Sequence, residues 1–99
     1  MNHGLSTATV AAIHQVLARF PEVSTATLYG SRAKGNHKPG SDVDLTLLGE
    51  NLTPSLLADI EEALDEQLLP YTVDLSIFEL LDHPPLKEHI QRVGLQLYP

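Results

Sequence analysis

Acidic side chains recur in this sequence at a spacing that suits the binding of a cation. Asp42 and Asp44 are two residues apart in the run Asp-Val-Asp-Leu-Thr-Leu-Leu. If this run is a strand, residues i and i+2 point to the same face, so the two carboxylates stand side by side. Neighbouring anions repel, and one of them stays protonated unless a cation compensates. Hard ions such as Mg²⁺, which take oxygen ligands, suit this pair.

A turn that favours anion binding precedes the two aspartates. Gly30 lets the backbone come close to a ligand, and Ser31 offers a hydroxyl and an amide. The residues that follow are expected to form one helical turn whose free N–H groups face an anion. Three of the six Lys and Arg residues lie between this turn and the aspartates, namely Arg32, Lys34 and Lys38. A solvated basic loop is the alternative. Because these residues lie between the turn and the aspartates, we favour a role in neutralising the charge of bound phosphates.

A third carboxylate is expected to lie near the pair. Residues 71–77 alternate as a half-buried strand, which places Asp74 on the polar face. If this strand neighbours the one with Asp42 and Asp44, the three carboxylates converge above one sheet face. An exposed strand aspartate is the simpler alternative, although Asp is depleted in strands.

The remaining elements are predicted from periodicity and from helix start and stop signals. A helix is expected from about Ser6 to Phe20, with a strand over Ser24 to Gly30. A second helix begins at Thr53-Pro54. Its predicted buried stripe is Leu56, Leu57, Ile60, Ala63, Leu64 and Leu68. A short helix from Pro84-Pro85 and a strand over Leu95 to Tyr98 complete the chain. His83 and His89 are expected at the surface, because no ligand motif joins them.

Composition limits the class of protein. With 99 residues and 42% hydrophobic content, the chain suits a single domain with one modest core. There is no cysteine and no apolar run of transmembrane length, and the N-terminus lacks a signal pattern, so we expect a cytoplasmic protein without membrane contact. The net charge of -7 argues against direct nucleic-acid binding.

The arrangement Gly30-Ser31, ten residues, Asp42-Val43-Asp44 resembles the signature of the DNA polymerase β-like nucleotidyltransferase superfamily. Together with the short chain, the sequence Gly-Ser-Arg-Ala-Lys-Gly resembles that of minimal nucleotidyltransferases, including the antitoxins of HEPN/MNT toxin–antitoxin pairs. The resemblance implies that residues 1–99 form one minimal nucleotidyltransferase domain. It also implies an α/β (α+β) fold, with a palm-like mixed β-sheet and helices packed on one face.

The resemblance implies a Mg²⁺- or Mn²⁺-dependent enzyme that transfers a nucleotide, with ATP as substrate. Asp42, Asp44 and Asp74 would be the catalytic and metal-binding residues. Gly30, Ser31, Arg32 and Lys34 would bind the nucleotide. In the implied reaction, an acceptor hydroxyl attacks the α-phosphate and pyrophosphate leaves, between two metal ions that clamp both oxygens.

The resemblance further implies a helical HEPN-type partner protein, one of whose hydroxyls receives the nucleotide, so activity would depend on that subunit. A homo-oligomer through an exposed sheet edge is an alternative. Two other functions stay open: the catalytic or nucleotide-binding subunit of a two-component small-molecule nucleotidyltransferase, and a non-catalytic nucleotide-binding partner protein.

Overall fold

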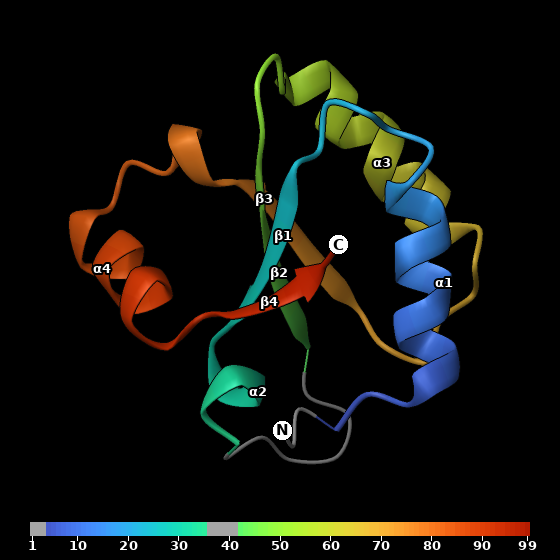
Figure 1. Cartoon of the computed structure of the whole chain (residues 1–99), viewed down its shortest axis with the longest axis horizontal. Coiled ribbons are helices and arrows are strands. Elements are labelled where there is room, and N and C mark those ends of the chain that lie inside the picture. Colours follow the sequence, from blue (N-terminus) through green and yellow to red (C-terminus); the bar gives the residue numbers. More distant parts are fainter. Residues whose placement is uncertain (1–3, 36–41) are drawn as a thin grey trace.

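A computed structural model describes residues 4–35 and 42–99 of the chain. Four strands form one sheet, and helices lie on its two sides (Figure 1). The elements in chain order are α1 (Thr7–Leu17), β1 (Thr25–Tyr29), α2 (Ser31–Lys34), β2 (Val43–Leu48), α3 (Pro54–Asp65), β3 (Val73–Ile77), the 3₁₀ turn η1 (Phe78–Leu80), α4 (Pro84–Val93) and β4 (Leu95–Tyr98).

The sheet is mixed, as predicted, with the strand order β3-β2-β1-β4. Strand β1 pairs antiparallel with both β2 and β4. Strands β2 and β3 pair in parallel, and α3 provides the connection between them. A parallel pair needs such a crossover, because a tight turn can join only antiparallel neighbours. The predicted α/β fold is therefore confirmed.

Side-chain caps define where the two longer helices begin. The hydroxyl of Ser6 accepts a hydrogen bond from the amide of Thr9, and the hydroxyl of Thr53 accepts one from Leu56. Each cap satisfies an amide that the first helical turn leaves without a partner. Both starts agree with the prediction.

Leu68 does not belong to the buried stripe of α3, which corrects the prediction. The helix ends at Asp65, and Leu68 follows it with a φ of 52°. Its side chain is 88% exposed. Because the chain leaves helical geometry before this residue, the helical spacing that predicted its burial no longer applies.

The hydrophobic core lies between the sheet and the pair α1 and α3, which Figure 1 shows on one side of the strands. The buried apolar residues of the strands point to this side, with Ala26 and Leu28 on β1 and Leu45 and Leu47 on β2. They alternate with polar residues, so one sheet face is apolar and the other carries the candidate chemistry.

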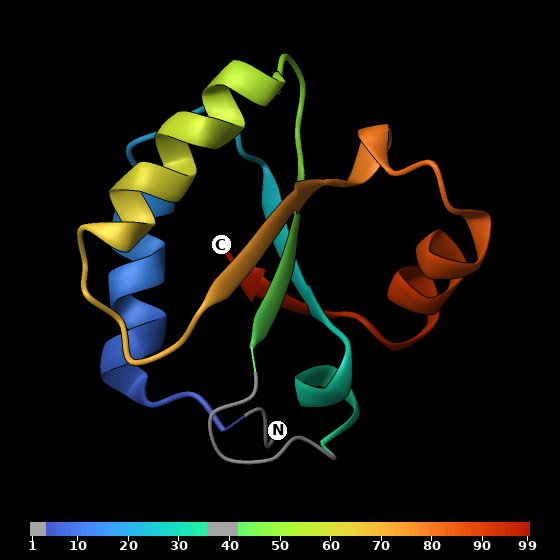
Figure 2. The same ribbon diagram turned by 180° about the vertical axis from the view of Figure 1, so that it is seen from behind.

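Helix α4 lies on the opposite side of the sheet from α1 and α3 (Figure 2), so the helices do not all pack on one face, which corrects that part of the expectation. It approaches β1, where Gly94 at the end of the helix meets Thr27. The polar face is therefore covered over β1, whereas Asp74 on β3 stays exposed. None of the helices formed by residues 4–35 and 42–99 has both the length and the apolar character required to cross a bilayer.

Candidate active site

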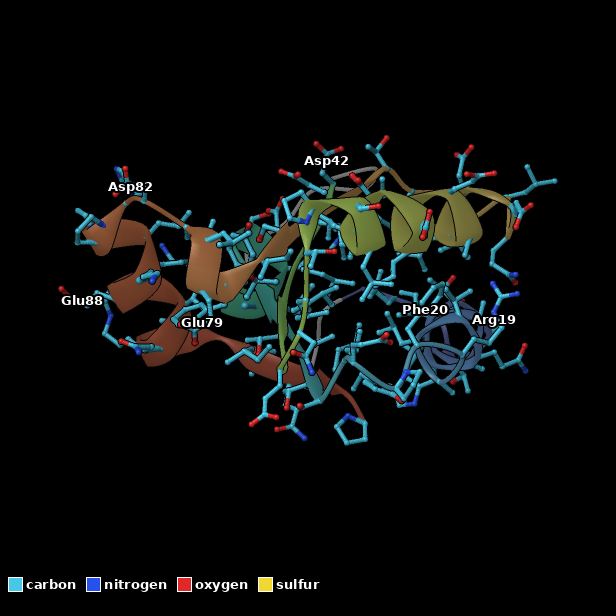
Figure 3. The ribbon with its side chains drawn as sticks, turned by 90° about the horizontal axis from the view of Figure 1, so that it is seen from above. Arg19, Phe20, Asp42, Glu79, Asp82 and Glu88 are labelled. Atoms are coloured by element: carbon cyan, nitrogen blue, oxygen red, sulfur yellow. The ribbon has the colours of Figure 1, made fainter. Side chains whose placement is uncertain are left out.

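Two of the three predicted carboxylates are direct neighbours in the sheet. Asp44 of β2 and Asp74 of β3 occupy paired positions in the parallel register, so their side chains leave the same face. Tyr29 of β1 pairs with Asp44 from the other side. Asp42 precedes β2 and lies on the outer surface of the molecule (Figure 3). The topology thus brings the three aspartates to one end of the sheet.

The electrostatics of Asp44 reflect this crowding. Partial burial raises the pKa of the Asp44 carboxyl above its usual value, and the charges of Asp74 and Asp42 raise this pKa further. A raised carboxyl pKa means that the negative charge is disfavoured where it stands. The site would gain stability from a cation or from a proton.

Gly30 brings the turn after β1 against Asp44. A Cβ atom at Gly30 would lie 2.6 Å from Oδ2 of Asp44, closer than two such atoms can approach. Its φ of 78° is also a conformation that side chains disfavour. The backbone conformation favours glycine here, and any side chain would also displace the Asp44 carboxylate. The turn and the carboxylate consequently form one continuous surface.

The residues after Gly30 form the predicted helical turn. Helix α2 begins at Ser31, and the amide of Lys34 donates to the carbonyl of Gly30 at 3.2 Å. Ser31 and Lys34 are exposed beside the aspartates' end of the sheet. Lys38, the third cation of the predicted phosphate loop, lies outside the described residues.

Arg32 is placed differently from the other residues of this turn. Its side chain is only 2% exposed, and its guanidinium stacks over the ring of Tyr71 at 4.8 Å. The hydroxyl of Tyr71 in turn donates to the carbonyl of Gly4. These contacts fasten α2 to the start of β3 and to the N-terminal segment. Phosphate binding by Arg32 stays a prediction.

A chain of hydroxyl groups lies beside the carboxylates, and sequence reasoning missed it. The side chains of Tyr29 and Ser76 share a hydrogen bond, and the Ser76 hydroxyl donates to that of Thr46 at 2.9 Å. Burial raises the pKa of Tyr29, and the charges of Asp44 and Asp74 add to the rise. The alternation of polar residues in β2 and β3 was the available signal, but it does not show that strands neighbour each other.

His89 also reaches the site, which corrects its prediction as a surface residue. Its Nε2 atom accepts a hydrogen bond from the amide of Gly30 at 3.3 Å. Its ring lies edge-on to the ring of Tyr29, with centroids 6.5 Å apart. His83, by contrast, is exposed and caps α4 by accepting from the amide of Leu86. The sequence carries no short-range signal for the His89 contact, since 59 residues separate it from Gly30.

The donor set fits a hard divalent cation. Carboxylate oxygens are the ligands that Mg²⁺ prefers, and it usually binds through one or two of them together with substrate phosphates. Within residues 4–35 and 42–99, no three His, Cys, Asp or Glu side chains are already grouped closely enough to hold a metal ion. Asp42, Asp44 and Asp74 therefore interact through their charges without forming a closed ligand cage.

Comparison with known proteins assigns the chain to a family. The family described as "Polymerase beta, Nucleotidyltransferase" matches residues 11–99. The chain belongs to this nucleotidyltransferase family, as its Gly-Ser turn and paired aspartates predicted. Its sequence is 33% identical over 90 residues to a Haemophilus influenzae relative described as a probable protein adenylyltransferase MntA. The match covers 90% of this chain and 75% of that relative.

Solved structures share the fold. A chain from a crystal structure of a toxin–antitoxin with AMP-PNP superposes with a TM-score of 0.72 at 23% identity, over 89% of this chain and 71% of the other. A second comes from a tri-AMPylated Shewanella oneidensis HEPN toxin in complex with MNT antitoxin, with a TM-score of 0.69 at 20% identity. That match covers 94% of this chain and 71% of the other. At these identities the likeness establishes the fold, and the predicted palm-like arrangement is confirmed.

Proposed function

We propose that this chain transfers the AMP unit of ATP to a hydroxyl group of a HEPN-type partner protein. The observation that carries the proposal is the register of Asp44 with Asp74, with the Gly30-Ser31 turn packed against Asp44. Carboxylates and the exposed Ser31 of the turn would then share one surface, as transfer from a nucleoside triphosphate requires. The family and the adenylyltransferase relative support the same reaction class.

The roles of the residues follow from where each one lies. Ser31 and Lys34 are exposed at the turn, where a hydroxyl and an ammonium would hold the β- and γ-phosphates. Gly30 gives the backbone clearance against Asp44. Buried Arg32 would act indirectly, by holding α2 in place through Tyr71.

The transfer step is a displacement at the α-phosphorus. The acceptor hydroxyl oxygen forms a bond to this phosphorus, the bond to the bridging oxygen breaks, and pyrophosphate leaves. Asp74 is the more exposed of the paired aspartates and would take the hydroxyl proton. Asp42 and Asp44, with Asp74, would hold Mg²⁺ or Mn²⁺, which when bound supplies charge neutralisation at the phosphates.

The acceptor is proposed to come from a partner that docks at the free edge of the sheet. Among the strands that the structure describes, β4 lies at the edge of the sheet and pairs with β1 alone. Its unpaired edge and the half-buried Tyr98 provide a surface for protein contact. The structural neighbours described as toxin–antitoxin complexes support a HEPN-type partner.

Co-expression with a HEPN-type protein encoded by the neighbouring gene tests the proposal. After purification, ATP and Mg²⁺ are added and the intact mass of each subunit is measured. The partner should gain the mass of one or more AMP units, and Asp42→Ala should abolish this gain. An unmodified partner would contradict protein adenylylation and favour a small-molecule acceptor, which assays with small hydroxyl compounds would then identify.

Calorimetric titration tests the ion requirement separately. Because the carboxylates repel a triphosphate unless a cation intervenes, ATP should bind with Mg²⁺ or Mn²⁺ and lose most of its affinity in EDTA. Equal affinity in both conditions would contradict the metal role. Binding without any transfer, even with the partner present, would favour the non-catalytic nucleotide-binding alternative.

A further inference from the structure

Helix α4 delivers one side chain to the Gly30-Ser31 turn from the far end of the chain. The Nε2 atom of His89 lies 3.3 Å from the amide nitrogen of Gly30. The same ring contacts Tyr29 edge-on, at an interplanar angle of 79°. His89 is thus held by a ring contact on one residue and by a hydrogen bond to the next.

The packing of α4 on β1 explains how the ring reaches this position. Ile90, the residue after His89, is 4% exposed and anchors the helix. At the helix end, a Cβ atom on Gly94 would lie 2.6 Å from Cγ2 of Thr27 and 2.4 Å from the carbonyl oxygen of Ile90. Only glycine permits this close approach of helix and strand. The fold therefore places His89 specifically over the end of β1.

The hydrogen bond sets the chemical state of the imidazole. An amide can only donate, so Nε2 must carry its lone pair, and the proton of the neutral ring resides on Nδ1. The bond also restrains the backbone at Gly30, because a glycine with a φ of 78° has many other conformations open to it. A turn with such freedom loses entropy when a ligand orders it, unless a contact has ordered it beforehand.

We infer that His89 is a positioning residue for the nucleotide-binding turn: its Nε2 atom holds the amide of Gly30 and so fixes the turn against Asp44 before the triphosphate binds. The inference rests on the proposed function for its consequence, though the contact itself does not. His89 touches no reacting atom in this scheme. Its effect passes through Gly30, whose backbone lies against the Asp44 carboxylate.

Two substitutions distinguish the effect of the Nε2 acceptor atom from the effect of the aromatic ring. His89→Phe keeps an aromatic ring for Tyr29 and removes the acceptor. His89→Gln removes the ring and supplies a carbonyl oxygen near the place of Nε2. The exposed Gln91 on the same helix provides a control, Gln91→Ala. Thermal unfolding of each variant establishes that the chain still folds.

Amide NMR of the nucleotide-free chain tests the contact directly. In His89→Phe, the Gly30 amide signal should shift and its hydrogen exchange should accelerate about tenfold, as expected for the loss of one hydrogen bond. Exchange in His89→Gln and Gln91→Ala should stay within about threefold of wild type. An unchanged Gly30 signal in His89→Phe would overturn the inference, whatever the nucleotide data show.

Nucleotide titration and transfer assays, run with the HEPN-type partner and Mg²⁺, test the consequence. His89→Phe should raise the Kd for ATP and the KM about five- to tenfold, with kcat changed less than about twofold, because positioning before binding affects affinity. His89→Gln should restore most of the affinity.

Equal losses in both variants would overturn the role of the acceptor atom. A wild-type chain that binds no ATP would instead refute the proposed function, and the Gly30 signal would still decide whether the contact exists.

Discussion

The two faces of the sheet are built by the same strands but have different roles. On the face toward α1 and α3, Leu45 and Leu47 are fully buried with the helices packed directly on them. On the opposite face, Asp44 and Thr46 of the same strand meet Asp74 and Ser76 of β3 in register. Strand alternation thus separates the residues that stabilise the fold from those that carry the chemistry.

The polar face gives up stability for function, whereas the apolar face does not. The apolar face gains free energy from every side chain that it buries. The polar face instead holds three carboxylates, and partial burial together with the charges of the other two raises the pKa of Asp44. Such an arrangement persists only because the other face stabilises the strands that carry it. Substitutions on the two faces should therefore have opposite signatures in stability and in transfer.

The largest effect is expected on transfer, from Asp74→Asn. If the carboxylate takes the acceptor proton, the amide cannot replace it, and transfer should fall by roughly 10²- to 10⁴-fold. The affinity for ATP should change less than about threefold, because a group used mainly in the transition state affects turnover more than binding. Calorimetry and intact mass of the partner measure the two quantities. Parallel loss of binding would make Asp74 a ligand on the nucleotide side.

On the apolar face, Leu45→Ala should lower the free energy of unfolding by about 3 kcal/mol, since a fully buried leucine leaves a cavity. Urea unfolding measures this loss. Asp44→Ala, one residue earlier on the opposite face, is the matched control and should not destabilise the chain. A similar loss in both variants would mean that the two faces do not divide stability and function.

Gly30→Ala tests the turn that packs against Asp44. It should lower the free energy of unfolding by about 1–2 kcal/mol, because the φ of 78° at this position disfavours a side chain. The added Cβ must also displace the Asp44 carboxylate. Gly35→Ala is the control, since Gly35 ends α2 with a similar φ of 77°. Thermal unfolding should show comparable losses for both, whereas ATP affinity should fall only in Gly30→Ala. Equal affinities would contradict the close packing of turn and carboxylate.

Local signals predicted most of the fold. Ser6 and Thr53 fixed the helix starts, and alternation gave β2 and β3 with Asp44 and Asp74 on their polar faces. These features depend on residues close in sequence. The burial of Leu68 was predicted wrongly, because periodicity does not register that the chain leaves the helix after Asp65.

Contacts between distant segments were not predictable in the same way. The parallel register of β2 and β3 depends on the α3 crossover, and nothing local specifies it. The stacking of Arg32 on Tyr71 and the bond from Gly30 to His89 likewise join separate elements. A basic residue in a phosphate-binding sequence looks the same whether it faces solvent or is buried, so its type alone did not reveal that Arg32 is buried.

The smallest effect is expected from Asp44→Asn, and its sign is opposite to that of the core substitution. The folded pKa of Asp44 is raised, so the folded chain binds this proton more tightly than the unfolded chain does. Wild-type stability should therefore decline as pH rises from the pKa of an unfolded aspartate, about 3.9, through the folded pKa. Above that window the penalty is fully present, and the neutral amide removes it.

At pH 7 the variant should thus be more stable than wild type by about 0.5 kcal/mol, a small gain because solvent screens a partly exposed carboxylate. The difference should vanish below the unfolded pKa, where wild type is protonated as well. Thermal unfolding of both chains across this range measures it. Added Mg²⁺ and ATP should stabilise wild type more than Asp44→Asn, because the cation then offsets the repulsion that the substitution has already removed. A variant less stable than wild type at pH 7 would show that Asp44 stabilises the fold. The polar face would then contribute to stability as well as to chemistry, which contradicts the proposed separation of the two faces.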